Sequence, residues 1–116
     1  MSRPTVFIVQ EPWPDRDTGE RIRDFTPAER FGDLKILLPH DHGPSSNLGL
    51  DLIEAGLRDY STSDYIVCSG HPAAIGVATA IVSRFGPVKL LIWSGRTREY
   101  NVIYFDPAVI EHATVG

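Results

Sequence analysis

Two short polar segments hold the residues best suited to ligand chemistry: His40, Asp41, His42, Ser45, Ser46, Ser69, Gly70 and His71. Imidazoles change charge near neutral pH, so His40 or His71 could serve as an acid or a base. Hydroxyls and backbone N–H groups at a helix start can hold a phosphate. If the two segments lie side by side, they predict a pocket for a phosphate-bearing or nucleotide ligand. The alternative is that the serines only cap helices and the histidines are solvated loop residues.

A metal site is a second interpretation of the first segment. On an extended chain, residues two apart point the same way, so His40 and His42 could meet one ion, with Asp41 or His71 completing the set. No second acidic ligand follows nearby, and histidines in loops are common. The sequence therefore predicts no metal and no cofactor.

Cys68 is the one cysteine of the chain, which excludes an internal disulfide framework and a paired-cysteine zinc knuckle. A nearby helix start could lower the pKa of its thiol. A small apolar core side chain is the commoner role of an unpaired cysteine. The chain also lacks a Walker-type loop and a GxGxxG motif. No residue is assigned a catalytic role, and a non-enzymatic protein is expected.

Apolar runs and helical periodicity indicate the elements that position these segments. Strands are expected at 6–9, 34–38, 65–68, 88–93 and 100–105, and helices at 47–60 and from 72 to about 85. The second helix has no charge before Arg84 and is expected to be buried on all sides. Alternating strands and helices predict an α/β fold with a Rossmann-like, mainly parallel sheet, whose C-terminal hairpin forms an antiparallel edge. Both polar segments follow strand ends, where ligands of such sheets bind.

Residues 11–33 form a long irregular excursion with three prolines and one short edge strand expected at Glu20–Phe25. A connection of this length in a small domain is usually functional or mobile. Trp13, flanked by Pro12 and Pro14, is either an exposed anchor for a partner or a lid that folds back on the core.

The C-terminal hairpin is the best candidate for a binding surface. The basic residues Arg96 and Arg98 lie between the aromatic residues Trp93 and Tyr100, and Arg84, Lys89 and Tyr104 extend this mixture of basic and aromatic residues. Trp, Tyr and Arg are enriched in interface hot spots, and an edge strand offers unpaired backbone. We therefore predict that Trp93, Arg96, Arg98 and Tyr100, with Trp13, bind a protein partner. The alternative is an ordinary charged turn that protects a sheet edge.

The chain of 116 residues is 42% apolar and 22% charged, which predicts a single globular domain over residues 1–116. It has no apolar run of about 18 residues and no signal-peptide pattern, so no membrane span and a cytoplasmic location are expected. The net charge of −4 argues against a general nucleic-acid coat. Local binding of a single strand by the hairpin is a weaker alternative.

Four segments resemble a family of small proteins encoded by tailed bacteriophages: Val6–Pro12, Phe31–Pro39, Asp64–Gly76 and Val88–Trp93. The part from Gly70 to Gly76 is the most specific. Where this chain has His71, many members of that family carry Asp, and they commonly carry Lys-Trp-Asp at positions 92–94. Asp before Pro is an efficient helix N-cap, so the position has a structural role in that pattern. The resemblance implies a phage context and no activity. The expected partner is then a host factor, another phage component or a second copy of the chain.

Overall fold

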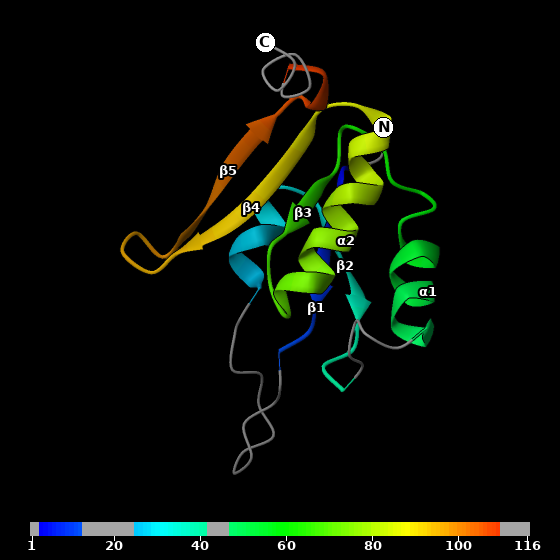
Figure 1. Ribbon diagram of the computed structural model, residues 1–116. Helices are drawn as coiled ribbons and strands as arrows, with labels where there is room; N and C mark the ends of the chain where they lie inside the picture. The colour runs from blue at the N-terminus through cyan, green and yellow to red at the C-terminus, as the bar shows by residue number, and fades with distance from the viewer. Residues whose placement is uncertain (1–2, 13–24, 42–46, 110–116) are drawn as a thin grey trace.

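The computed structural model describes residues 3–12, 25–41 and 47–109 of the chain (Figure 1). Its strands are β1 (Thr5–Gln10), β2 (Asp33–Leu38), β3 (Tyr65–Val67), β4 (Val88–Ser94) and β5 (Glu99–Phe105). Its helices are α1 (Asn47–Gly56) and α2 (Pro72–Val82), with two short 3₁₀ helices, η1 (Thr26–Arg30) and η2 (Ser83–Phe85).

The five strands form one sheet in the order β2-β1-β3-β4-β5. The first four strands pair in parallel, and β4 and β5 form an antiparallel hairpin. The predicted α/β class, the mainly parallel sheet with its antiparallel edge and the two main helices are confirmed. The strand order is not the 3-2-1-4-5-6 order of dinucleotide-binding folds; it is the other common order of parallel α/β sheets, in which β1 and β3 are neighbours.

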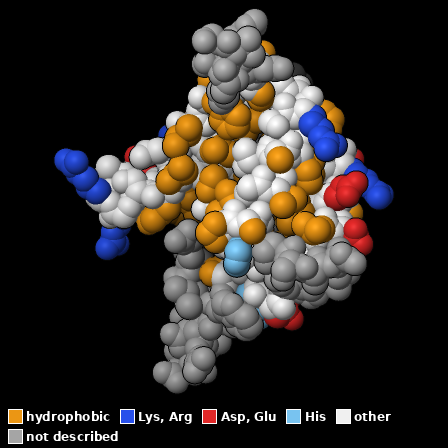
Figure 2. Space-filling model, viewed as in Figure 1, with side chains coloured by type: hydrophobic (Ala, Val, Ile, Leu, Met, Phe, Trp, Pro, Cys, Tyr) orange, Lys and Arg blue, Asp and Glu red, His pale blue; other side chains and the backbone are white. Residues whose placement is uncertain are grey.

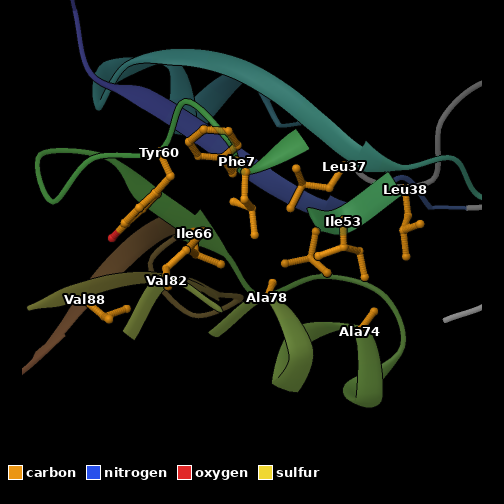
Figure 3. Close-up of a cluster of buried hydrophobic side chains, with 12 residues drawn as sticks. Phe7, Leu37, Leu38, Ile53, Tyr60, Ile66, Ala74, Ala78, Val82 and Val88 are labelled. Carbon is orange, nitrogen blue, oxygen red and sulfur yellow. The ribbon is translucent and has the colours of Figure 1, made fainter. Parts of the chain in front are cut away.

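Both α-helices cover the same face of the sheet (Figure 1). α1 connects β2 to β3 and α2 connects β3 to β4, so both connections run along the sheet in the same direction. Because such connections are right-handed, two that run in the same direction place their helices on the same face. Figure 3 shows the core of this layer, where Phe7 and Ile66 from the sheet meet Ile53 of α1 and Ala78 of α2. These side chains are at most 1% exposed, so this face is a closed apolar core.

The opposite face is covered by η1 rather than by an α-helix. Phe25 and Ala28 of this segment pack with Val6 and Ile8 of β1, and all four side chains are buried. The sequence did not predict η1. Of the edge strand expected at 20–25, residues 20–24 lie outside the described residues, and Phe25 belongs to the core.

The prediction that α2 is buried on all sides is wrong. Ala74, Ala78 and Val82 are fully buried, whereas Gly76 and Ala80 are exposed. The helices form a single layer, so the outer side of α2 has no element above it among the described residues. Small side chains on that side keep the exposed apolar area low. No helix in the described part of the chain is long and apolar enough to cross a membrane.

Candidate functional site

The carboxyl ends of β1 and β3 form the topological switch point of the sheet. These strands are neighbours, but β1 leads to β2 on one side and β3 leads to β4 on the other. Connections that leave in opposite directions open a crevice in which ligands of α/β proteins commonly bind. The structure thus brings the Ser69–His71 segment beside the end of β1 and His40 beside it on the other flank.

Gln10, the last residue of β1, occupies this crevice. Its side-chain oxygen accepts a hydrogen bond from the backbone N–H of His71 at 3.0 Å, and its side-chain NH₂ donates to the Pro39 carbonyl at 3.4 Å. Its own carbonyl accepts from the Ser69 hydroxyl at 3.0 Å. Gln10 therefore ties the β2 and β3 loops together at the place where a ligand would bind.

His71 caps α2. Its Nδ1 accepts a hydrogen bond from the Ala73 N–H at 3.0 Å, and its carbonyl accepts from the N–H groups of Ala74 and Ile75. Pro72 follows at the first position of the helix, where its missing N–H costs nothing. The His71 side chain is thus the N-cap of α2, and one of its ring nitrogens is already used.

His40 lies at the other side of the crevice, with its Nδ1 3.9 Å from a carboxylate oxygen of Glu11. Asp41, the next residue, is exposed. Within the described residues no group of three His, Cys, Asp or Glu side chains could hold a metal ion. His42, Ser45 and Ser46 lie outside the described residues. The described part of the site therefore holds the imidazoles of His40 and His71, the carboxylates of Glu11 and Asp41, the Ser69 hydroxyl and Gln10.

Cys68 does not have the surroundings of a nucleophile. It follows β3 directly, its N–H donates to the Leu91 carbonyl, and its side chain is partly buried. Burial raises the pKa of its thiol above the ordinary value, because a thiolate is poorly solvated there. The thiolate that would attack a substrate is therefore disfavoured.

The β4–β5 hairpin carries the residues predicted to bind a partner. Arg96 and Arg98 are exposed at its tip, and Figure 2 shows basic side chains projecting there on the left of the molecule. Trp93 is half-buried and packs edge-on against Tyr100, with ring centroids 5.1 Å apart. Tyr100 is only 4% exposed, so it supports Trp93 from the core side. Trp13 lies outside the described residues.

Sequence reasoning did not single out Gln10 or the exposed Val102 and Ile103 of β5. Val102 and Ile103 are 45% and 46% exposed, and Tyr104 beside them, an aromatic residue that the sequence had associated with the hairpin surface, is 63% exposed. The signal for Gln10 is its position as the polar residue that ends an apolar strand. The signal in the sequence for an unprotected edge strand is the run of six residues 100–105, which contains no charged residue and no proline.

The model of a protein family, the phage Pam3 gp32-like proteins, matches residues 4–107. This match spans the whole sheet and both α-helices. The chain belongs to the Pam3 gp32-like family. The predicted resemblance to proteins of tailed phages is confirmed in its phage origin. No curated protein and no solved structure matches the chain. The family thus gives the chain its phage context.

Proposed function

We propose that this member of the Pam3 gp32-like family is a non-enzymatic phage accessory protein that binds a protein partner through its β4–β5 hairpin. The observation that carries the proposal is the outer edge of β5, which pairs with no strand in the described part of the chain and where Val102, Ile103 and Tyr104 are exposed beside the basic tip. A partner that binds such an edge strand buries its exposed apolar side chains. The same partner can also form hydrogen bonds with the unpaired backbone groups of the strand. The host cytoplasm is where such a protein would act.

A binding role is also favoured over catalysis by the state of the candidate catalytic groups. Ring nitrogen Nδ1 of His71 caps a helix, and burial disfavours the Cys68 thiolate. A catalytic nucleophile or base has to be available to a substrate. The hairpin tip, in contrast, directs exposed guanidinium groups into solvent.

The proposal is tested by capture from lysates of the host with a tagged bait. The variant Arg96→Ala/Arg98→Asn removes two charges at the tip; Asn at position 98 suits the positive φ of 57° found there. The control Arg58→Ala/Arg84→Ala removes two exposed charges elsewhere. We expect a partner that is retained by the control and lost by the tip variant. A partner captured equally by both variants would contradict the assignment of the hairpin.

A second candidate function is binding of a phosphorylated small molecule at the switch point. It is favoured by the convergence of Gln10, His40 and the Ser69–His71 loop at the carboxyl ends of three parallel strands. It is opposed by the carboxylate of Glu11, which lies beside His40 and repels anions. Thermal unfolding with a panel of nucleotides tests it, since a ligand at 100 times its Kd adds about 2.7 kcal/mol of stability. No shift with any nucleotide would exclude this class.

A further inference from the structure

β5 is the last strand of the sheet, and no described strand lies beyond it (Figure 1). It pairs with β4 without a bulge, from Val88 opposite Phe105 to Ser94 opposite Glu99. In such a strand every second residue turns its N–H and C=O away from the neighbouring strand. The outer side of β5 is therefore a straight row of backbone donors and acceptors that another strand can meet.

The two edges of the sheet differ in how they are protected. The opposite edge, β2, carries the exposed charges of Asp33 and Lys35, and Asp33 forms an ion pair with Arg3. Charged side chains are a usual protection against pairing of edges. β5 has no charge and no proline from Tyr100 to Phe105. Its exposed apolar side chains, led by Tyr104, lie on both faces of the strand because successive residues alternate.

The β5 segment is close to self-complementary about Val102. In an antiparallel pairing of two copies centred on this residue, Val102 meets its own copy and Tyr100 lies opposite Tyr104. Arg98 and Asp106 flank β5 at its two ends, so in the same register Arg98 of one copy comes near Asp106 of the other at each end of the pairing. Opposite charges in facing positions stabilise a strand pair, and like charges destabilise it. The basic tip and the acidic residue after β5 are thus placed for two equivalent ion pairs.

We propose that the strand that pairs with β5 is the β5 of a second copy, in a two-fold dimer with one continuous sheet. This inference rests on the proposed function of the hairpin and names its partner. In this register even-numbered residues of one β5 pair with even-numbered residues of the other, so their side chains lie on the same face of the joined sheet. The two-fold axis is then perpendicular to the sheet, and α2 of both copies lies on the same side. The exposed Ile103 on the α2 side then lies diagonally across the seam from its counterpart. Such a contact is isologous and closes after two copies, which is the commonest symmetry of soluble oligomers.

Charge reversal tests both the contact and its register with the full-length chain. Sedimentation of the wild-type protein over a concentration series is expected to show a dimer. Arg98→Asp and Asp106→Arg each replace two attractions by two repulsions and should raise the dimer Kd on the order of tenfold or more. When the two variants are mixed, each facing pair again holds opposite charges, so a heterodimer is expected. Asp tolerates the left-handed backbone at position 98, where φ is 57°.

The mixing experiment also controls for local damage. The Asp106 carboxylate accepts a hydrogen bond from the Ala108 N–H, and Asp106→Arg removes it. A variant damaged in this way would not recover on mixing. An independent variant, Val102→Lys, places two ammonium groups opposite each other at the axis, whereas Val102→Thr keeps the branched shape. We expect dissociation with Lys and a dimer with Thr.

The outcomes separate this inference from the function on which it rests. A wild-type chain that stays monomeric at every concentration overturns the dimer. If the Arg96→Ala/Arg98→Asn variant nevertheless loses a captured partner, the hairpin remains a binding site for another protein. A dimer that all three charge variants leave unchanged overturns pairing through β5. Dimers weakened by single variants but not restored on mixing overturn the register centred on Val102.

Discussion

Gln10 fills the space that a side chain at Gly70 would need: a Cβ built at Gly70 would lie 2.3 Å from the Cβ of Gln10. Gly70 also has a φ of +94°, which L residues rarely adopt. The two residues therefore depend on each other where the loops after β1 and β3 meet. Gln10 thus fills the space beside Gly70 between the two loops at the switch point.

We predict that Gly70→Ala destabilises the fold strongly, because it combines the positive φ with the collision against Gln10. Gln10→Gly alone should cost at least about 1–2 kcal/mol through lost hydrogen bonds. The double variant Gln10→Gly/Gly70→Ala should be more stable than the sum of the single effects implies, because glycine at position 10 has no Cβ, so the collision is removed and only the backbone strain at position 70 remains. Urea unfolding of the four proteins measures this coupling. Additive effects would show that the close approach does not matter to stability.

The cap of α2 gives a second prediction. His71→Ala removes the acceptor for the Ala73 N–H and should lower the free energy of unfolding by about 1 kcal/mol. His71→Asp restores an acceptor and adds a negative charge at the helix start, where it is favourable. We therefore expect the Asp variant to be at least as stable as the wild type, as measured by thermal unfolding. An Asp variant as unstable as the Ala variant would argue against the capping role.

Two helical glycines are predicted to respond oppositely to alanine. A Cβ at Gly56 would lie 2.5 Å from a methyl carbon of Leu37, where α1 approaches β2. A Cβ at Gly76 of α2 would meet nothing within 4 Å. Alanine favours a helix over glycine by about 1 kcal/mol. Gly76→Ala should thus raise the unfolding free energy by up to that amount, and Gly56→Ala should lower it.

Chemical unfolding of both variants tests the prediction, and each serves as the control of the other, because the substitution is identical. Gains of stability at both positions would show that Leu37 moves aside without cost. Losses at both would show that the outer side of α2 is packed against something absent from the monomer.

The carboxyl group of Asp64 anchors the other end of the sheet. It is 5% exposed and accepts hydrogen bonds from the N–H groups of Thr5 and Ser61, at 2.8 and 2.9 Å. Asp64→Ala leaves both donors without this acceptor and should cost about 1–3 kcal/mol. Asp64→Asn keeps one acceptor oxygen and should cost less. Calorimetry of both variants measures the difference, and equal losses would indicate that charge alone matters at this position.

The elements that depend on local periodicity were predicted well from the sequence. Apolar runs at β1 and β3 and the Gly-His-Pro start of α2 contain their own signals, so the α/β class followed. The strand order did not follow, because pattern rules do not say whether β2 lies beside β1 or beyond β3. η1 was missed for a related reason. Phe25 and Ala28 are isolated apolar residues in a polar stretch, and only the uncovered face of the sheet explains why they are buried.

The candidate site was predicted in part. The carboxyl ends of the strands placed His40 and the Ser69–His71 loop together, because parallel strands end at the same edge. The sequence could not show that Gln10 occupies the space between them, since that depends on the neighbouring strand. The burial of Tyr100 could not be predicted for the same reason, because it depends on residues distant in the sequence. Tyr100 packs in the cluster that includes Ala28 of η1, and against Trp93 on the neighbouring strand.

Cys68 gives the last prediction, which concerns pH. Burial raises the pKa of the thiol in the folded protein, while in the unfolded chain it ionises near its ordinary pKa of about 8.5. Folding therefore favours the protonated thiol. This contribution to stability is fully present below the unfolded pKa and is lost as pH rises through the folded pKa. Between about pH 8 and pH 10 the free energy of unfolding should fall, and Cys68→Ser should reduce that slope.

Alkylation by iodoacetamide checks the same physical cause directly. At pH 8 the folded chain should react more slowly than the chain in denaturant, because both the thiolate fraction and access are lower. Burial of Tyr60 also raises its pKa, with a smaller contribution from Asp64. Tyrosine is half ionised in the unfolded chain at about pH 10, so Tyr60 contributes to the fall in stability, and the comparison with Cys68→Ser separates the two groups. A folded thiol that reacts as fast as the denatured one would show that burial does not protect Cys68, and one that reacts faster would make it a candidate for covalent chemistry.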